Sequence, residues 1–290
     1  MSAMVKRNLK IYFRDKASVF FSMLSVIIIF ALYILFIGDS VNSGLKFLPH
    51  PNRLMRAWMR AWMLAGMLAS ASITTSLGAY GVMISDRENK AIKDFYSSPV
   101  SRRQVAGGYI VTGFIISIIM SIFTLIFGEI YLGLAGGAVL DVETLLKLFA
   151  VIVLSSFASS AIASFIISFL KTNSSYSAAS TIVGTLIGFL VGAYIPIGSL
   201  PDNVQWLVKY FPCAHSAVLY RQLLMKPAIK ANFANQPASV LKEIREMFGI
   251  VFVYDGHTAP AWVSVAVLLV TGAIFYLLAV LVMTRKQNEI

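Results

Sequence analysis

The sequence predicts an all-α membrane protein with six transmembrane helices, on three observations. Hydrophobic residues make up 58% of the 290 residues and charged residues only 13%, about half the share of roughly 25% that soluble domains carry. Long apolar runs recur along the chain, and basic residues gather in the segments between them. A backbone in lipid must satisfy its own hydrogen bonds, and the alternating pattern of a β-barrel is absent, so each crossing must be helical.

Six apolar runs are each long enough to cross about 30 Å of hydrocarbon. They cover residues 17–38, 61–85, 104–128, 148–170, 176–200 and 261–284. The first run follows basic residues, as in a secretory signal, but it is too long for a signal-peptide core and no small-residue cleavage site follows it. We therefore interpret it as an uncleaved first span, and residues 1–290 as one membrane domain.

The placement of Lys and Arg predicts that both termini are cytoplasmic. With the N-terminus inside, the cytoplasmic segments hold thirteen basic residues and the short outer loops hold five, as the positive-inside rule requires. Four of those five lie in the first outer loop, which opposes this orientation. Basic residues outnumber acidic ones by 24 to 13, but the surplus flanks apolar runs, so membrane lipid rather than nucleic acid is the expected partner.

Residues 5–15 are predicted to form an amphipathic helix on the inner membrane surface. Val5 and Leu9 recur at helical spacing, whereas Lys6 and Lys10 occupy another face. Two roles fit this helix: an anchor held by anionic lipid, or a docking element for a partner.

The loop of residues 86–103 is the most charged stretch of the chain. It carries eight charges of mixed sign with apolar side chains between them. We therefore expect a short helix that inserts into a groove of a soluble partner, rather than a solvated loop. The residues expected to dock are Arg87, Glu88, Lys90, Ile92, Lys93 and Phe95.

The loop of residues 201–260 is predicted to fold on the outer side of the membrane. Its first part, 201–224, is aromatic and semi-apolar, which suits helices at or dipping into the outer interface. After Pro237, apolar residues between 240 and 248 share one face and Gly249 can end the segment. We expect one short amphipathic external helix there, either a lid over the bundle or a substrate contact.

This order of elements, together with the charged loop, resembles the ABC-2 permease superfamily. The family pattern reads E-R-E-x-G-T-L-x-x-L followed by P-[VL]-S-R, and residues 86–95 and 99–102 match it here. Lys90 replaces the usual glycine and Ala91 the usual threonine. A weaker match covers residues 200–221, and the architecture matches over the whole chain.

The resemblance implies a permease that pairs with a second copy or a sibling permease. It also implies that two soluble ABC ATPase subunits bind the charged loop, which serves as a coupling helix. The sequence has no G-x-x-x-x-G-K-[ST] loop to cradle phosphates. We therefore expect a transport subunit that is not itself an enzyme and holds no cofactor, with ATP and Mg²⁺ bound by the partner ATPase, in the plasma membrane of a prokaryotic cell.

Two spans carry small and hydroxyl side chains that allow close helix packing. The fifth span has a small residue at every fourth position, which suits packing within one subunit or a dimer seam. These residues are Ser180, Gly184, Gly188 and Gly192. Hydroxyl groups in the second span commonly bond back to their own helix. In the resembled family, however, spans two and five border the translocation path, so Ser72, Thr75 and Ser76 are candidates for a substrate path.

No other residue stands out as a chemical site. Glu129 is the one acidic residue amid apolar sequence, but it lies near the outer interface, which weakens a proton-relay role. His50, His215, His257 and the single Cys213 match no metal, protease or nucleophile pattern. We expect no catalytic and no metal-binding residue.

The predicted function is export of a drug, antibiotic, peptide or lipid-like substrate with energy from a separate ATPase. Export of a polysaccharide or a lipid-linked glycan by the same mechanism stays open. An ion-coupled transporter would need buried charges in the spans, which offer almost none. A membrane enzyme would need convergent acid, base or metal groups, and none is found.

Overall fold

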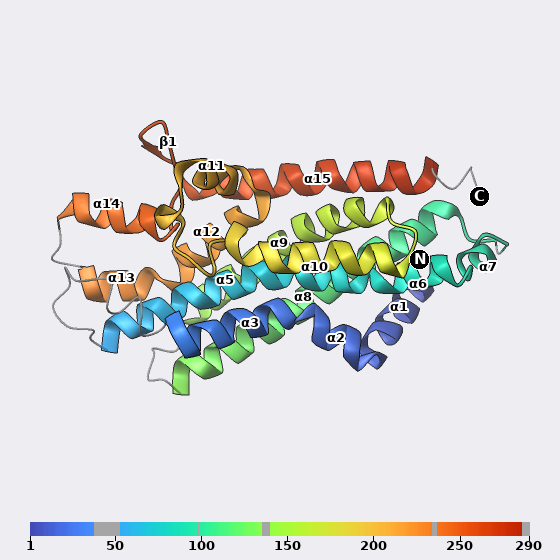
Figure 1. Ribbon diagram of the computed structural model, residues 1–290, viewed down its shortest axis with the longest axis horizontal. Helices are drawn as coiled ribbons and strands as arrows, with labels where there is room; N and C mark the ends of the chain where they lie inside the picture. Colours follow the sequence, from blue (N-terminus) through green and yellow to red (C-terminus); the bar gives the residue numbers. More distant parts are fainter. Residues whose placement is uncertain (38–52, 98, 135–139, 234–236, 286–290) are drawn as a thin grey trace.

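The protein is an elongated bundle of helices that lie nearly side by side (Figure 1). A lengthwise arrangement lets each apolar helix bury its side chains against several neighbours while its backbone hydrogen bonds stay internal. The computed structural model describes all residues except 38–52, 98, 135–139, 234–236 and 286–290. Part of the predicted first outer loop, with His50, therefore lies outside the described residues.

The two ends of the bundle carry different elements. Helices α1 (Ser2–Arg14) and α7 (Ile92–Ser97) lie at one end together with the end of α15 (Ala261–Arg285), which we call the α7 end. Helices α13 (Lys226–Phe233) and α14 (Ala238–Met247) lie at the other, which we call the α14 end (Figure 1). The two ends thus separate the charged loop from the segment predicted to be external.

Five of the six predicted spans have a counterpart among the candidate membrane helices of the described residues. Four single helices are long and apolar enough to cross a membrane, and a bent pair makes a fifth if it counts as one span. The single helices are Ala57–Glu88, Arg103–Leu134, Val142–Ser168 and Ala261–Met283, and the bent pair is Lys16–Ser22 with Leu24–Leu35. The chain is a multi-pass, mostly helical membrane protein.

The first predicted span is broken near its start. Helix α2 (Lys16–Ser22) begins where the Asp15 carboxylate accepts a hydrogen bond from the backbone N–H of Ser18 at 3.1 Å, as an N-cap residue does. Helix α3 (Leu24–Leu32) continues at 47° to α2 and passes into a π-helical turn, η1 (Tyr33–Ile37).

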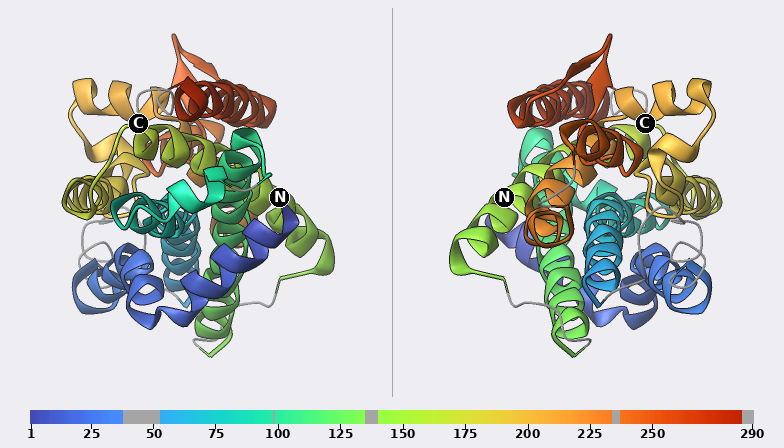
Figure 2. Two further views of the ribbon diagram at one scale, coloured as in Figure 1. Left: turned by 90° about the vertical axis from the view of Figure 1, so that its right-hand side faces the viewer. Right: turned by 90° about the vertical axis from the view of Figure 1, so that its left-hand side faces the viewer.

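Helix α5 (Arg53–Ala79) lies in the middle of the bundle and is continued by α6 (Gly81–Glu88). It packs against α8 (Arg102–Leu134), α9 (Val142–Ser168) and several shorter helices, as the end-on views show (Figure 2). Small side chains make this central position possible: a Cβ added to Gly78 would lie 2.4 Å from a side chain of α2. Helix α9 packs most extensively against α15.

Helix α10 (Asn173–Leu190) is shorter than the fifth span predicted over 176–200. It begins at a Thr172 cap and ends after 18 residues, a length of about 27 Å. The chain then turns at Gly192, whose φ of +64° is left-handed and cannot continue the helix. Helix α10 is not among the candidate membrane helices of the described residues, so six spans remain a prediction.

The segment after α10 folds into short elements around one buried helix. It contains η2 (Ile197–Ser199), α11 (Asp202–Tyr210), α12 (Pro212–Leu224), and an antiparallel pair of β1 (Val253–Tyr254) with β2 (His257–Thr258). Helix α12 packs against α5, α9 and α15, so it lies inside the bundle. The amphipathic helix predicted after Pro237 corresponds to α14.

Arg221 holds the ends of two helices together inside this segment. Its guanidinium is fully buried and donates to the carbonyl oxygens of Val191 and Gly192 at 2.7 Å and to that of Gly249 at 3.3 Å. Its Cζ lies 5.6 Å from the Trp62 ring centroid. Burial lowers the pKa of Arg221 to about 9. Carbonyls at helix C-termini carry partial negative charge and stabilise such a cation, and no ion pair to it is present in the described part of the chain.

Candidate functional site

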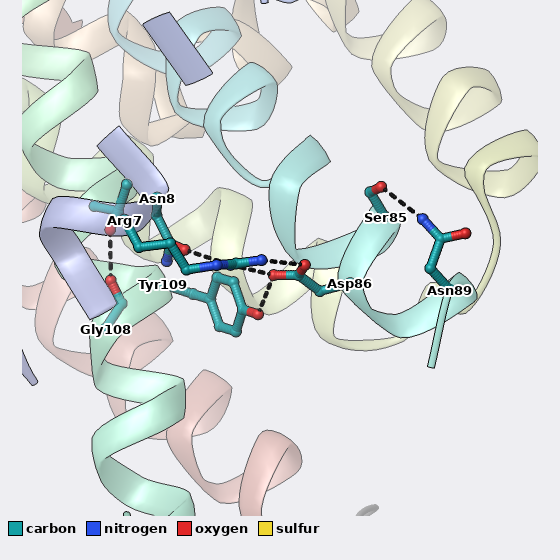
Figure 3. Close-up of polar contacts among 8 residues, drawn as sticks. Arg7, Asn8, Ser85, Asp86, Asn89, Gly108 and Tyr109 are labelled. Atoms are coloured by element: carbon teal, nitrogen blue, oxygen red, sulfur yellow. Dashed lines mark hydrogen bonds and ion pairs between the residues drawn. The ribbon is translucent and has the colours of Figure 1, made fainter. Parts of the chain in front are cut away.

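At the α7 end, Asp86 joins three helices through its buried carboxylate (Figure 3). Arg7 of α1 binds both carboxylate oxygens, with each of the two N–O distances at 2.7 Å. Tyr109 of α8 donates its hydroxyl to the same carboxylate at 2.6 Å. Charge-assisted, bidentate contacts between an arginine and a carboxylate are among the stronger hydrogen bonds in proteins. The N-terminal helix is therefore attached to α6 and α8 at a defined position.

Arg7 also contacts the charged loop itself. Its Cζ lies 5.0 Å from the centroid of the Phe95 ring in α7, a cation–π distance. The hydrogen bond from Arg7 to Asp86 is the main reason that the pKa of Arg7 lies above its ordinary value. One side chain thus links α1, α6 and α7.

Two residues predicted to dock bind neighbouring helices instead of pointing only to solvent. Arg87 donates to the carbonyl oxygens of Ile167 at 3.2 Å and Leu170 at 2.8 Å, at the C-terminal end of α9. Exposed Glu88 accepts a hydrogen bond from the side chain of Asn173 at the start of α10. The residues just before α7 therefore connect it to α9 and α10.

The remaining docking candidates lie on and just before α7. Lys90 and Lys93 are exposed, whereas Ile92 and Phe95 are half-buried. Lys90 has a φ of +61°, and its carbonyl accepts from the N–H of Lys93 at 2.9 Å in the turn that starts α7. A left-handed backbone costs a non-glycine residue roughly 1–2 kcal/mol. This explains why the resembled family has glycine at this position.

A cavity of about 840 Å³ lies between α2, α3, α5 and α10. Its lining mixes hydroxyl and apolar side chains, and no charged residue is among the described residues that line it. Helix α5 contributes Thr74, Leu77 and Gly78, and α10 contributes residues that include Ser180 and Gly184. An uncharged, partly polar cavity of this size suits a drug-sized amphipathic molecule.

The predicted stripe of small residues divides between this cavity and the end of α10. Ser180 and Gly184 line the cavity, and a Cβ added to Gly184 would meet nothing within 4 Å. A Cβ on Gly188 would lie 2.1 Å from the Tyr194 ring, so Gly188 packs against its own subunit. Gly192 lies beyond the helix, in the left-handed turn. The expectation of a continuous four-residue helical stripe is therefore wrong at its last position.

The hydroxyl groups predicted for a substrate path are buried among helices rather than on the cavity wall. Ser72 accepts from Ser155 of α9 at 2.9 Å. Thr75 donates to the carbonyl oxygen of Ala71 at 2.6 Å, and Ser76 donates to that of Ser72 at 2.7 Å. These are the bonds back to their own helix that hydroxyls in spans commonly make.

The other candidates do not converge on a chemical site. Cys213 is buried, and desolvation raises the pKa of its thiol to about 12, so it is not a nucleophile at neutral pH. Glu129 is half-buried near the end of α8. No group of three His, Cys, Asp or Glu side chains that could hold a metal occurs in the described part of the chain.

His215 is a buried structural side chain in α12. Its Nδ1 lies 3.0 Å from the Ser264 hydroxyl and its Nε2 lies 3.1 Å from the carbonyl oxygen of Lys209. Desolvation lowers its pKa to about 4. The imidazole is therefore neutral at pH 7 and joins α12 to α11 and α15.

Sequence reasoning singled out the charged loop but missed the side chains that support it. Arg7 and Asp86 lie 79 positions apart, and Arg221 binds carbonyls 28 to 30 positions away. No local pattern links such residues. The only sequence signals were that Arg7 lies in the basic N-terminal segment and that Asp86 directly follows the second apolar run.

The sequence was also compared with known protein families. A family described as "ABC-2 family transporter protein" matches residues 60–281. The chain belongs to the ABC-2 transporter family. The resemblance inferred from the charged loop is thereby confirmed, and no curated protein matches the chain.

As an ABC-2 family member, the chain is a transmembrane permease component of an ABC transporter and not its ATPase. The matched region includes α6, α7 and α10, but α1 with Arg7 and the α2–α3 wall of the cavity precede it. Arg7, which attaches the charged loop to α1, therefore lies outside the matched region.

Proposed function

We propose that this ABC-2 permease exports its substrate with energy from a separate soluble ABC ATPase that docks on α7. The observation that carries the proposal is that the segment before α7 is attached to four other helices: Asp86 binds α1 and α8, Arg87 binds the end of α9, and Glu88 binds the start of α10. Lys90 and Lys93 are exposed to a partner, while Arg7, Arg87 and Glu88 connect the same segment to the bundle. A force applied to α7 would therefore be transmitted directly to the helices that this segment binds.

Two of the helices connected to α7 through this segment also line the cavity. Helix α6 continues α5, which carries Thr74 and Gly78 on one wall. Glu88 contacts the start of α10, which forms another wall. A displacement of α7 would therefore shift α5 relative to α10, which is the kind of rigid-element motion that opens and closes transport paths.

In this proposal the cavity is one half of the substrate path, and a second copy or a sibling permease supplies the other half. The cavity lies between α2, α3, α5 and α10 and is lined by hydroxyl and apolar groups. Such a lining fits a drug, an antibiotic, a peptide or a lipid-like molecule better than a polysaccharide, which needs a denser row of polar groups. An ion-coupled mechanism is less well supported because the described lining has no charge to bind an ion.

Charge reversal at Lys90 and Lys93 tests the docking step. Both side chains are exposed, so Lys90→Glu/Lys93→Glu should leave the permease folded but abolish co-purification with the ATPase and ATP-dependent transport. The matched control is Lys230→Glu/Lys242→Glu, two exposed lysines at the α14 end. Arg87 is unsuitable for this test because its loss would also uncap α9. Full transport by the first variant, or transport by the permease alone without ATP, would refute the proposal.

A further inference from the structure

A second hollow lies at the α7 end, between α1 and α8. Its volume is about 460 Å³, and its lining is mainly apolar. Its apolar lining includes Val5 and Leu9 of α1 and Val111 of α8, which we call its apolar floor, and Lys6 and Lys10 also line it. In the end-on view, α1 crosses in front of α8 (Figure 2).

The close approach of α1 to α8 depends on two adjacent glycines. A Cβ added to Gly108 would lie 2.7 Å from the Met4 side chain, and one added to Gly107 would lie 3.4 Å from that of Met1. The backbone of α8 thus forms one side of the contact. The hollow opens beside this contact, where Val111 is half-buried.

The charges beside the hollow have no acidic partner among the residues that the structure describes. Lys6 and Lys10 lie one helical turn apart and are exposed, and α1 contains no acidic residue. Arg7 faces Asp86 on another side of α1. Among the described residues, neither lysine takes part in an ion pair. The site therefore combines two cations with an apolar hollow.

We propose that this hollow binds one anionic phospholipid of the adjoining leaflet, with the phosphate between Lys6 and Lys10 and an acyl chain along Val5, Leu9 and Val111. Phe13, one helical turn after Leu9 and Lys10 on the same side of α1, is exposed, which favours a membrane lipid over a soluble peptide as the occupant. A free phosphate ion would use the lysines but leave the apolar floor uncovered. The lipid would also steady the helix that carries Arg7, and through it the position of Phe95.

Lipid binding is measured on the purified permease without any ATPase, so the result is independent of the proposed transport mechanism. Spin-labelled phosphatidylglycerol and phosphatidylcholine serve as probes in reconstituted vesicles. The wild-type chain should retain phosphatidylglycerol in preference to phosphatidylcholine. Lys6→Gln/Lys10→Gln should weaken phosphatidylglycerol binding about 30-fold, since each lysine near a membrane surface contributes about 1 kcal/mol. Lys230→Gln/Lys242→Gln, at the α14 end, should have no effect.

A second variant distinguishes lipid binding in the hollow from general electrostatic attraction of anionic lipid to the surface lysines. Val111→Trp fills the hollow and keeps both lysines, so it should also abolish the preference for phosphatidylglycerol. Inorganic phosphate should not displace the bound lipid. The proposal is overturned if wild type binds both lipids equally, if the lysine variant binds normally, or if Val111→Trp retains full preference.

Discussion

Replacing Arg7 by methionine should loosen the α7 end of the bundle. The change removes two 2.7 Å contacts and leaves the Asp86 carboxylate, whose side chain is 9% exposed, without its cation. Breaking a fully buried ion pair costs about 3–5 kcal/mol, and an exposed pair contributes about 0–1 kcal/mol. Because the Arg7 side chain is 33% exposed and Tyr109 still donates to Asp86, we expect a loss of about 2 kcal/mol in unfolding free energy.

The assay is thermal unfolding of the purified permease, in which this loss corresponds to about 5 °C, combined with a double-mutant cycle. Arg7→Met and Asp86→Asn should each destabilise the protein, and the double variant should lose less than their sum by at least about 1 kcal/mol. Arg14→Met, at an exposed position of the same helix, is the control. Additive effects of the two substitutions would refute the inference that this pair attaches α1 to α6.

Three further predictions follow from single positions. Lys90→Gly should raise the unfolding free energy by about 1 kcal/mol, because glycine adopts the φ of +61° at this position without strain. Lys93→Gly, in α7, should lower the unfolding free energy by a similar amount. Chemical unfolding of the isolated permease measures both changes. The pKa of His215 is about 4 in the folded protein against an ordinary 6.5, so the unfolded chain binds more protons between these values. Stability should therefore fall as the pH falls from 6.5 to 4, by at most about 3 kcal/mol, and His215→Gln should remove this part of the slope. Gly184→Leu should block transport without loss of stability, because its side chain enters open cavity space, whereas Gly188→Leu should destabilise the protein by a clash with the ring of Tyr194.

Each of these has a contradicting outcome. A lower stability of Lys90→Gly would mean that the turn before α7 does not store strain. An identical pH slope in wild type and His215→Gln would place the acid sensitivity elsewhere. Normal transport by a stable Gly184→Leu variant would exclude the cavity from the substrate path.

The positions of most spans could be predicted because hydropathy is a local property. The runs of 104–128, 148–170 and 261–284 overlap helices at Arg103–Leu134, Val142–Ser168 and Ala261–Met283. The charged loop was found for the same reason: charges of mixed sign between two apolar runs cannot lie in lipid.

The fifth predicted span shows where local reasoning ends. Residues 191–200 are nearly as apolar as those before them, so hydropathy extends the helix through them. The structure ends α10 at Leu190, where Gly192 is left-handed and Arg221 binds the freed carbonyls. A helix end that depends on a side chain about 30 positions away leaves no trace in a hydropathy window.

The amino-acid sequence alone determined that this chain crosses a membrane repeatedly, that it belongs with the ABC-2 permeases, and that residues 86–103 form its charged segment. These conclusions rest on composition and short motifs, which are properties of neighbouring residues. Only the tertiary structure decided that Arg7 binds Asp86, that Ser72 is buried among helices, and that Gly184 faces a cavity. Such facts depend on how distant helices are rotated against each other, and that rotation follows from packing between their surfaces.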